Sequence, residues 1–170
     1  MSITGDWYKS EDCPQDATSL VGGAIDTGAE LNGNLDELFE LGYSRFLGKT
    51  PYQRFRKIFF KNSGNAISEA VVYWQDSENR EQLYFAFEKV AGDTSTNSAT
   101  MPSGYTTGDF YNVIGLEQGV DIPTCPGISV TGEIPALTGS FGLWVWQYIP
   151  NGNPDETGAL GTLAIAGVVA

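Results

Sequence analysis

Hydrophobic and polar positions in the middle of the chain alternate with the two-residue period of β-strands. The segment 82–90 is the clearest case, because Leu83, Phe85 and Phe87 share one face of the predicted strand. Polar, turn-forming residues separate this segment from two other strand-like runs. The pattern therefore predicts an antiparallel meander with strands at 54–60, 66–75 and 82–90.

The second half of the chain continues the strand pattern. Apolar runs predict strands at 110–116 and 127–131 and a closing strand at 159–169. The strand predicted at 141–149 is apolar on both faces, which is typical of a strand that is central in a sandwich or covered by a neighbouring chain. About seven short strands predict a mostly β chain that folds as a single antiparallel β-sandwich or jelly-roll-like domain.

Three regions depart from this pattern. Residues 1–33 are rich in glycine and aspartate and predict an extended, irregular N-terminal arm, which leaves 34–170 for the sandwich. Residues 34–42 predict one short helix, because an asparagine can cap its start and a glycine can end it. Residues 91–108 lack periodicity, and a loop of this length in a compact domain is either mobile or functional.

Charge is unevenly distributed along the chain. The 170 residues carry 21 acidic and 9 basic side chains, for a formal charge of −12. Six of the nine basic residues fall within 45–61, where no acidic residue occurs. This segment is either a solvated strand face or a basic strip that steers docking onto an acidic neighbour, with Arg54, Arg56 and Lys57 as candidate contact residues. The acidic remainder argues against nucleic acid and anionic membranes as main partners.

Large aromatic residues gather in the strand predicted at 141–149. Aromatic residues that recur every second position in a strand are most often core residues. Trp144 and Trp146 are nevertheless also candidates for contact with a neighbouring chain, because the other face of their strand already supplies a core. A carbohydrate-binding platform built on these tryptophans is a further alternative.

The chain contains no histidine. It therefore lacks the commonest general base and the commonest zinc ligand, and it cannot form a Ser–His or Cys–His nucleophile pair. Carboxylates remain available for catalysis, but no spacing singles out a pair among the 21 acidic residues. We expect no enzymatic activity, no cofactor and no metal.

Two cysteines, Cys13 and Cys125, are too few for a disulfide framework. We expect ordinary thiols in a reducing compartment, with a bridge between the two as the alternative. The first residues lack the basic and apolar regions of a signal peptide, and no apolar run approaches the ~20 residues of a membrane span. The sequence thus predicts a protein made in the cytosol.

Several segments together resemble small virion proteins of tailed bacteriophages. The resemblance lies in the aromatic and basic strand at 52–62 and in the Leu-Trp-Val-Trp strand and its loop at 143–150. The Trp-Tyr-Lys-Ser start at 7–10 and the Gly-Gly-Ala-Ile stretch at 22–25 precede them in the same order. One position departs from the pattern, since Gln147 stands where arginine usually follows the tryptophan. The resemblance implies an all-β virion component without catalysis, present in several copies.

The function expected from this resemblance is that of a capsid decoration, or cement, protein, which stabilises the phage head lattice by adding buried interface. The expected partners are the major capsid protein or other virion proteins, together with copies of the chain itself in a homo-oligomer. The expected location is the virion, after assembly in the host cytoplasm. The alternatives are a baseplate, tail-fibre or adaptor protein of the same particle, or a carbohydrate-binding module.

Overall fold

The computed structural model describes residues 2–13, 19–31, 38, 52–75, 83–149 and 162–170. The chain is mostly β, and its strands form two antiparallel sheets in a sandwich-like arrangement. The described strands are β1 (Gly5–Asp12), β2 (Val21–Leu31), β3 (Tyr52–Asn62), β4 (Ile67–Trp74), β5 (Leu83–Phe87), β6 (Thr94–Ser95), β7 (Val120–Asp121), β8 (Ser140–Ile149) and β9 (Leu163–Val169). Two short 3₁₀ helices, η3 (Thr107–Asp109) and η4 (Leu116–Gln118), lie between β6 and β7.

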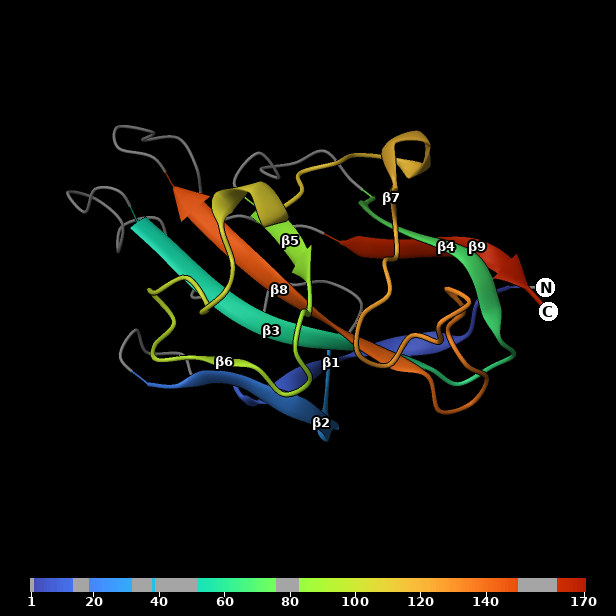
Figure 1. Ribbon diagram of the computed structural model, residues 1–170, viewed down its shortest axis with the longest axis horizontal. Helices are drawn as coiled ribbons and strands as arrows, with labels where there is room; N and C mark the ends of the chain where they lie inside the picture. The colour runs from blue at the N-terminus through green and yellow to red at the C-terminus, as the bar shows by residue number, and fades with distance from the viewer. Residues whose placement is uncertain (1, 14–18, 32–37, 39–51, 76–82, 150–161) are drawn as a thin grey trace.

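The larger sheet holds six strands in the order β5-β8-β3-β1-β2-β6 (Figure 1). Its longest pairing joins β3 and β8, whose register runs without a bulge from Tyr52–Ile149 to Lys61–Ser140. Both strands are rich in aromatic and β-branched residues, which fit a pleated backbone. The two-sided apolar strand predicted at 141–149 is β8, and it is central in the sheet.

The smaller sheet, in the order β7-β4-β9, covers one face of the larger sheet. Ile67, Val72 and Trp74 of β4 are fully buried and belong to the same core as Leu143 and Val145 of β8. From Ala70 to Trp74 alternate residues of β4 point into this core, which is the period-2 pattern expected of a strand buried on one face. A register shift between Ser68 and Val71 interrupts this alternation after Ile67. Burial of such side chains is the main favourable contribution to folding, at roughly 1.5–3 kcal/mol for each large one.

The opposite face of the larger sheet carries a second core. Phe55 of β3 and Trp144 of β8 pack there against Tyr105 and Phe110, which come from the segment after β6. This segment crosses the front of the sheet in Figure 1, and Phe55 N donates to the Ser98 carbonyl oxygen at 2.6 Å. The aperiodic stretch predicted at 91–108 is therefore a cover for the second core.

The expected irregular arm at 1–33 is wrong for the residues that the structure describes. Residues 5–12 and 21–31 are strands of the larger sheet, and β1 lies between β3 and β2. The glycines did not stop β2 because its pairing with β1 contains two register shifts, which take up the irregular backbone. The N-terminal strands thus belong to the sandwich.

The predicted meander is also wrong in its pairing. Strands β3 and β5 both pair with β8, whereas β4 lies in the other sheet. Residues 110–116 and 127–131 form bridges and turns in place of the two predicted strands. The reason is that periodicity reports which face is buried and carries no information about the hydrogen-bonding neighbour. The helix predicted at 34–42 lies outside the described residues, except for Leu38, which is fully buried.

Deleting residues 162–170 should yield insoluble protein. This truncation removes β9 and bares Ile67, Val72 and Trp74 together with the backbone of β4. The soluble fraction and the thermal unfolding curve measure the effect. Val168→Thr is the matched control, since Val168 is 55% exposed and its change should leave the protein soluble. A soluble truncation that unfolds cooperatively would contradict the prediction.

Candidate functional site

The three central residues of the predicted basic strip lie on β3. Arg56 and Lys57 are fully buried, and Arg54 is half-buried. A solvent-facing strip is therefore wrong for Arg56 and Lys57, because both faces of β3 are covered. Arg56 pairs across the sheet with Val145 of the main core, whereas Lys57 pairs with Trp144 of the second core. The other basic residues of the strip before β3, Arg45 and Lys49, lie outside the described residues.

Lys57 is surrounded by oxygen atoms. Its Nζ lies 2.5 Å from Glu88 Oε1 and 2.8 Å from Asp93 Oδ1. It also donates to the carbonyl oxygen of Gly23, at 2.9 Å, and approaches that of Asp93, at 3.2 Å. These oxygens take the place of water around a buried ammonium, which would otherwise be too costly to desolvate.

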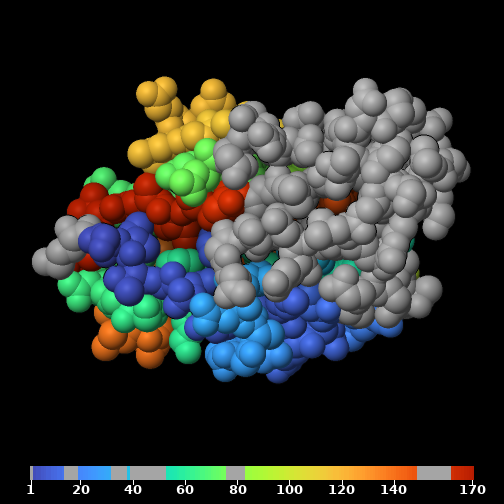
Figure 2. All heavy atoms as spheres, turned by 180° about the vertical axis from the view of Figure 1, so that it is seen from behind, coloured from blue at the N-terminus to red at the C-terminus, as the bar shows by residue number. Residues whose placement is uncertain are grey.

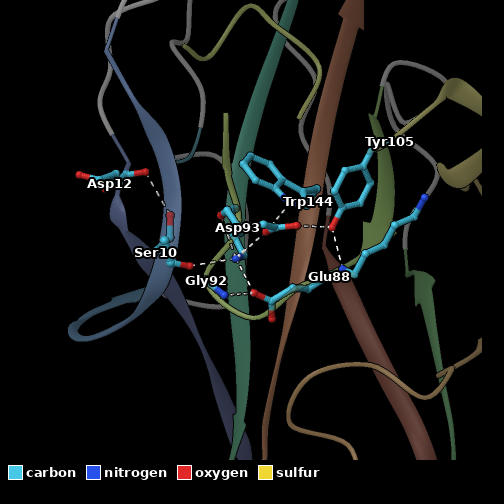
Figure 3. Close-up of polar contacts among 10 residues, drawn as sticks. Ser10, Asp12, Glu88, Gly92, Asp93, Tyr105 and Trp144 are labelled. Atoms are coloured by element: carbon cyan, nitrogen blue, oxygen red, sulfur yellow. Dashed lines mark hydrogen bonds and ion pairs between the residues drawn. The ribbon is translucent and has the colours of Figure 1, made fainter. Parts of the chain in front are cut away.

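Asp93 is held on both of its carboxylate oxygens (Figure 3). Trp144 Nε1 donates to Oδ1 at 3.0 Å, and the Tyr105 hydroxyl donates to Oδ2 at 2.6 Å. Burial, followed by the hydrogen bond to Asp93, raises the pKa of Tyr105, so its hydroxyl stays protonated and remains a donor. Glu88 is held in a similar way, since its Oε1 also accepts from the Gly92 N–H at 2.9 Å.

The backbone turn at 88–93 places the two carboxyl groups. Asp93 N donates to the carbonyl oxygen of Val90 at 3.1 Å, which closes the turn, and Gly23 N donates to the carbonyl oxygen of Asp93 at 3.0 Å. Gly22 has a φ of 115°, and a Cβ at this position would lie 2.6 Å from the Asp93 carbonyl oxygen. Only glycine permits this approach of β2 to the turn. The Gly22–Gly23 doublet thus supplies an acceptor for Lys57.

The cluster of Lys57, Glu88, Asp93, Tyr105 and Trp144, here called the lysine cluster, is largely closed to solvent. Lys57 is 0% exposed, Glu88 3% and the Asp93 side chain 13%. Two surface hollows of about 310 Å³ and 190 Å³ lie beside it, and Glu88 lines both. Within the described ranges, no three His, Cys, Asp or Glu side chains are arranged to hold a metal ion. The lysine cluster thus holds one amine in contact with two carboxyl groups.

Sequence reasoning found Lys57 but missed Glu88, Asp93 and Tyr105. Acidic residues are so frequent in this chain that neither carboxylate stood out. One available signal was the phase of Lys57, which falls between Phe55 and Phe59 on one strand face. A lysine in phase with buried aromatic residues requires an anionic partner, although the sequence does not say which one.

Trp144 and Trp146 lie in the second core. Trp144 is 0% exposed and Trp146 8%. Trp146 stacks on Phe55 with ring centroids 5.9 Å apart, and it meets Phe110 edge-on at 5.5 Å. Because the chain itself covers both rings, the structure offers no exposed platform on them for a carbohydrate or for a neighbouring chain.

Both cysteines are free thiols at half-buried positions. Burial raises the pKa of Cys125 to about 12, and the charge of Glu88 adds to this shift. Burial also raises the pKa of Cys13, although the nearby Arg56 opposes the shift. Neither thiol is activated as a nucleophile, because activation requires a lowered pKa.

The chain matches no family model, no curated protein and no solved structure. By its fold it is a mostly β, sandwich-like protein. Among the residues that the structure describes, no helix has the length and apolar character needed to cross a membrane.

Replacing Lys57 with Gln should lower the free energy of unfolding by at least about 3–5 kcal/mol, because the change leaves the buried carboxyl groups of Glu88 and Asp93 without the lysine that they contact. Lys89→Gln is the matched control. It removes a cation whose ion pair with Asp109, at 2.9 Å, is 43% exposed on the lysine side, and it should cost less than about 1 kcal/mol. Urea unfolding of the two variants measures the difference. Equal losses would show that the buried cluster does not hold the fold.

Iodoacetamide should alkylate the folded protein at pH 8 at least about tenfold more slowly than the urea-unfolded chain, because raised thiol pKa values leave little thiolate. Mass spectrometry follows the alkylation. Because the pKa of Cys125 rises from 9.0 to about 12 on folding, the thiol of the unfolded chain ionises first, and the free energy of unfolding falls as the pH rises through this interval. Cys125→Ser should weaken this alkaline loss of stability. A folded protein alkylated as fast as the unfolded one would refute this description of the thiols.

Proposed function

We propose that this chain is a non-catalytic structural protein of a virion, most specifically a capsid decoration protein that docks on the head lattice through the outer face of its smaller sheet. The observation that carries the proposal is the uncharged edge strand β9. No residue from 162 to 170 carries a charged side chain, and β9 is at the edge of its sheet. Natural proteins usually protect such an edge with charges or cover it.

The outer face of this sheet gathers apolar side chains. Val168 of β9 and Leu116 of η4 are each 55% exposed, and Val71 and Tyr73 of β4 are half-buried between them. Figure 2 shows β9, in red, at the surface of the molecule beside the N-terminal segment. Contiguous exposed apolar surface on a soluble protein is typical of a protein-binding site.

The charge around this face indicates the chemistry of the partner. The exposed acidic residues Glu69, Glu117 and Asp121 lie on β4, η4 and β7, next to the apolar centre. Burial of Arg56 and Lys57 removes two of the nine basic side chains from the solvent surface. An apolar surface with a basic rim therefore fits this face best, and we assign that surface to the major capsid protein.

Val168→Lys should abolish binding to particles that lack this protein, because it places a charge on the apolar face at the edge strand β9. Its thermal unfolding should match that of the unchanged protein, since Val168 is exposed. Co-sedimentation with the particles measures the binding. The control is Val130→Lys, which adds the same charge in a turn at a position that is 92% exposed and should leave binding intact.

Equal binding of both variants would contradict a role for this face. Electron microscopy of particles saturated with labelled protein then locates the attachment. Label on the head supports a decoration protein, and label confined to the tail moves the proposal to a baseplate, tail-fibre or adaptor protein.

Binding of the unchanged protein should slow as salt is added, because the acidic rim steers association.

A further inference from the structure

The lysine cluster brings together the reactants for an amide bond. The Lys57 amine contacts the carboxylate of Asp93, and the carboxylate of Glu88 contacts the same amine from another side. Three donors to the carboxylates are also fixed, namely Trp144 Nε1, the Tyr105 hydroxyl and Gly92 N. We propose that Lys57 and Asp93 condense to an intramolecular isopeptide bond, with Glu88 as the proton acceptor and donor.

The reaction balances without an external reagent. Glu88 takes one proton from the Lys57 ammonium, and the freed amine attacks Cγ of Asp93, so that the Nζ–Cγ bond forms. One Cγ–O bond of Asp93 then breaks, and this oxygen leaves as water with the proton from Glu88 and a second proton from Nζ. The amide keeps the third proton, Glu88 returns to a carboxylate, and one ammonium and one carboxylate are consumed together with no change in net charge.

The hydrogen-bond donors are placed where negative charge develops. Attack on Cγ builds charge on the oxygens of Asp93, and Trp144 and Tyr105 donate to one oxygen each. Fixed donors at such oxygens are the usual means by which proteins stabilise a tetrahedral intermediate. Because Tyr105 has a raised pKa, it remains a donor throughout the neutral pH range. The Gly23 carbonyl oxygen, already 2.9 Å from Nζ, can accept the N–H of the product amide.

Burial favours the condensation in two ways. Reactants held in contact behave as if at effective concentrations of about 10⁵–10⁸ M. A site from which water is largely excluded also destabilises the separated charges of the ammonium and the carboxylate relative to a neutral amide. The Asp93 side chain is 13% exposed, so the released water can reach the solvent.

The product amide would link the centre of the larger sheet covalently to the turn that precedes its edge strand β6. Lys57 belongs to β3, and Asp93 lies at the end of the turn that leads from β5 to β6. An amide between them closes the intervening chain covalently, which restricts the unfolded state in the same way as a disulfide does. The inference depends on the lysine cluster alone and is independent of the proposed docking face.

The test is the intact mass of the purified, fully denatured wild-type protein. We expect a mass lower than that calculated from the sequence by one water molecule, and a branched peptide that joins Lys57 to Asp93 after digestion with trypsin and chymotrypsin. Neither observation requires any variant to fold. The full calculated mass after prolonged incubation of the folded protein would overturn the proposal, and so would a lost water that maps to other residues.

Variants assign the roles. Lys57→Arg keeps a cation but supplies no nucleophilic amine, and Asp93→Ala removes the electrophile, so both should show their full calculated masses. Glu88→Gln removes the proton acceptor while keeping the shape, and it should show the full mass or a much slower loss of water. If Glu88→Gln lost water at the wild-type rate, the assigned role of Glu88 would be wrong.

The exposed ion pair between Lys89 and Asp109 serves as the matched control. Its Nζ–Oδ1 distance of 2.9 Å is almost the same as that of Lys57 and Asp93, but its lysine is 43% exposed. The donors that Asp109 has besides Lys89 among the described contacts both come from Thr106 and both bind Oδ2, whereas Asp93 accepts from fixed donors on both of its oxygens. Asp109→Asn should therefore leave the loss of water unchanged. Loss of the mass difference in this variant would show that the bond forms elsewhere.

Discussion

A lysine ammonium buried on a central strand requires oxygen atoms from several distant segments at once. Lys57 obtains them from β2, through Gly23, and from the turn after β5, through Glu88 and Asp93. Each contact offsets part of a desolvation cost that no single partner could cover. The cluster consequently fixes the positions of the N-terminal strands and of the 88–93 turn relative to the centre of the sheet. The Gly22–Gly23 doublet of β2 is therefore needed to supply a hydrogen-bond acceptor to the Lys57 side chain of β3.

The larger sheet is unusual for an antiparallel sheet in being covered on both faces of its strands β3 and β8. One face packs on the smaller sheet, and the other packs on the segment after β6 through Tyr105 and Phe110. Antiparallel sheets more often leave one face to water, which gives a clean alternation of polar and apolar residues. Here β8 has no polar face, and its tryptophans are used internally. The loop cover also brings Tyr105 to Asp93, so that the second core and the lysine cluster form together.

Burial of Arg56 and Lys57 changes the surface as well as the interior. Nine basic side chains offset part of the negative charge of the 21 acidic residues. Two of the nine, Arg56 and Lys57, are not accessible to solvent. Glu88 and most of Asp93 are buried with them, so the formal charge left for the exterior stays close to the −12 of the sequence. Such an acidic surface keeps molecules of the same charge apart. The face proposed for docking includes the uncharged β9, since residues 162–170 hold no charged side chain.

The sequence by itself determined the strands with strong alternation or long apolar runs, namely β3, β4, β5, β8 and β9, and it determined that β8 is buried on both faces. The local pattern suffices for these features because the periodicity of a segment indicates which of its side chains are buried. Tertiary structure alone decided which strands are neighbours, that β1 and β2 join the sheet, and that Lys57 meets Glu88 and Asp93. A backbone hydrogen bond between strands is insensitive to side-chain identity, and any of many acidic residues could have neutralised the lysine. Both choices therefore depend on how the whole chain closes around its two cores.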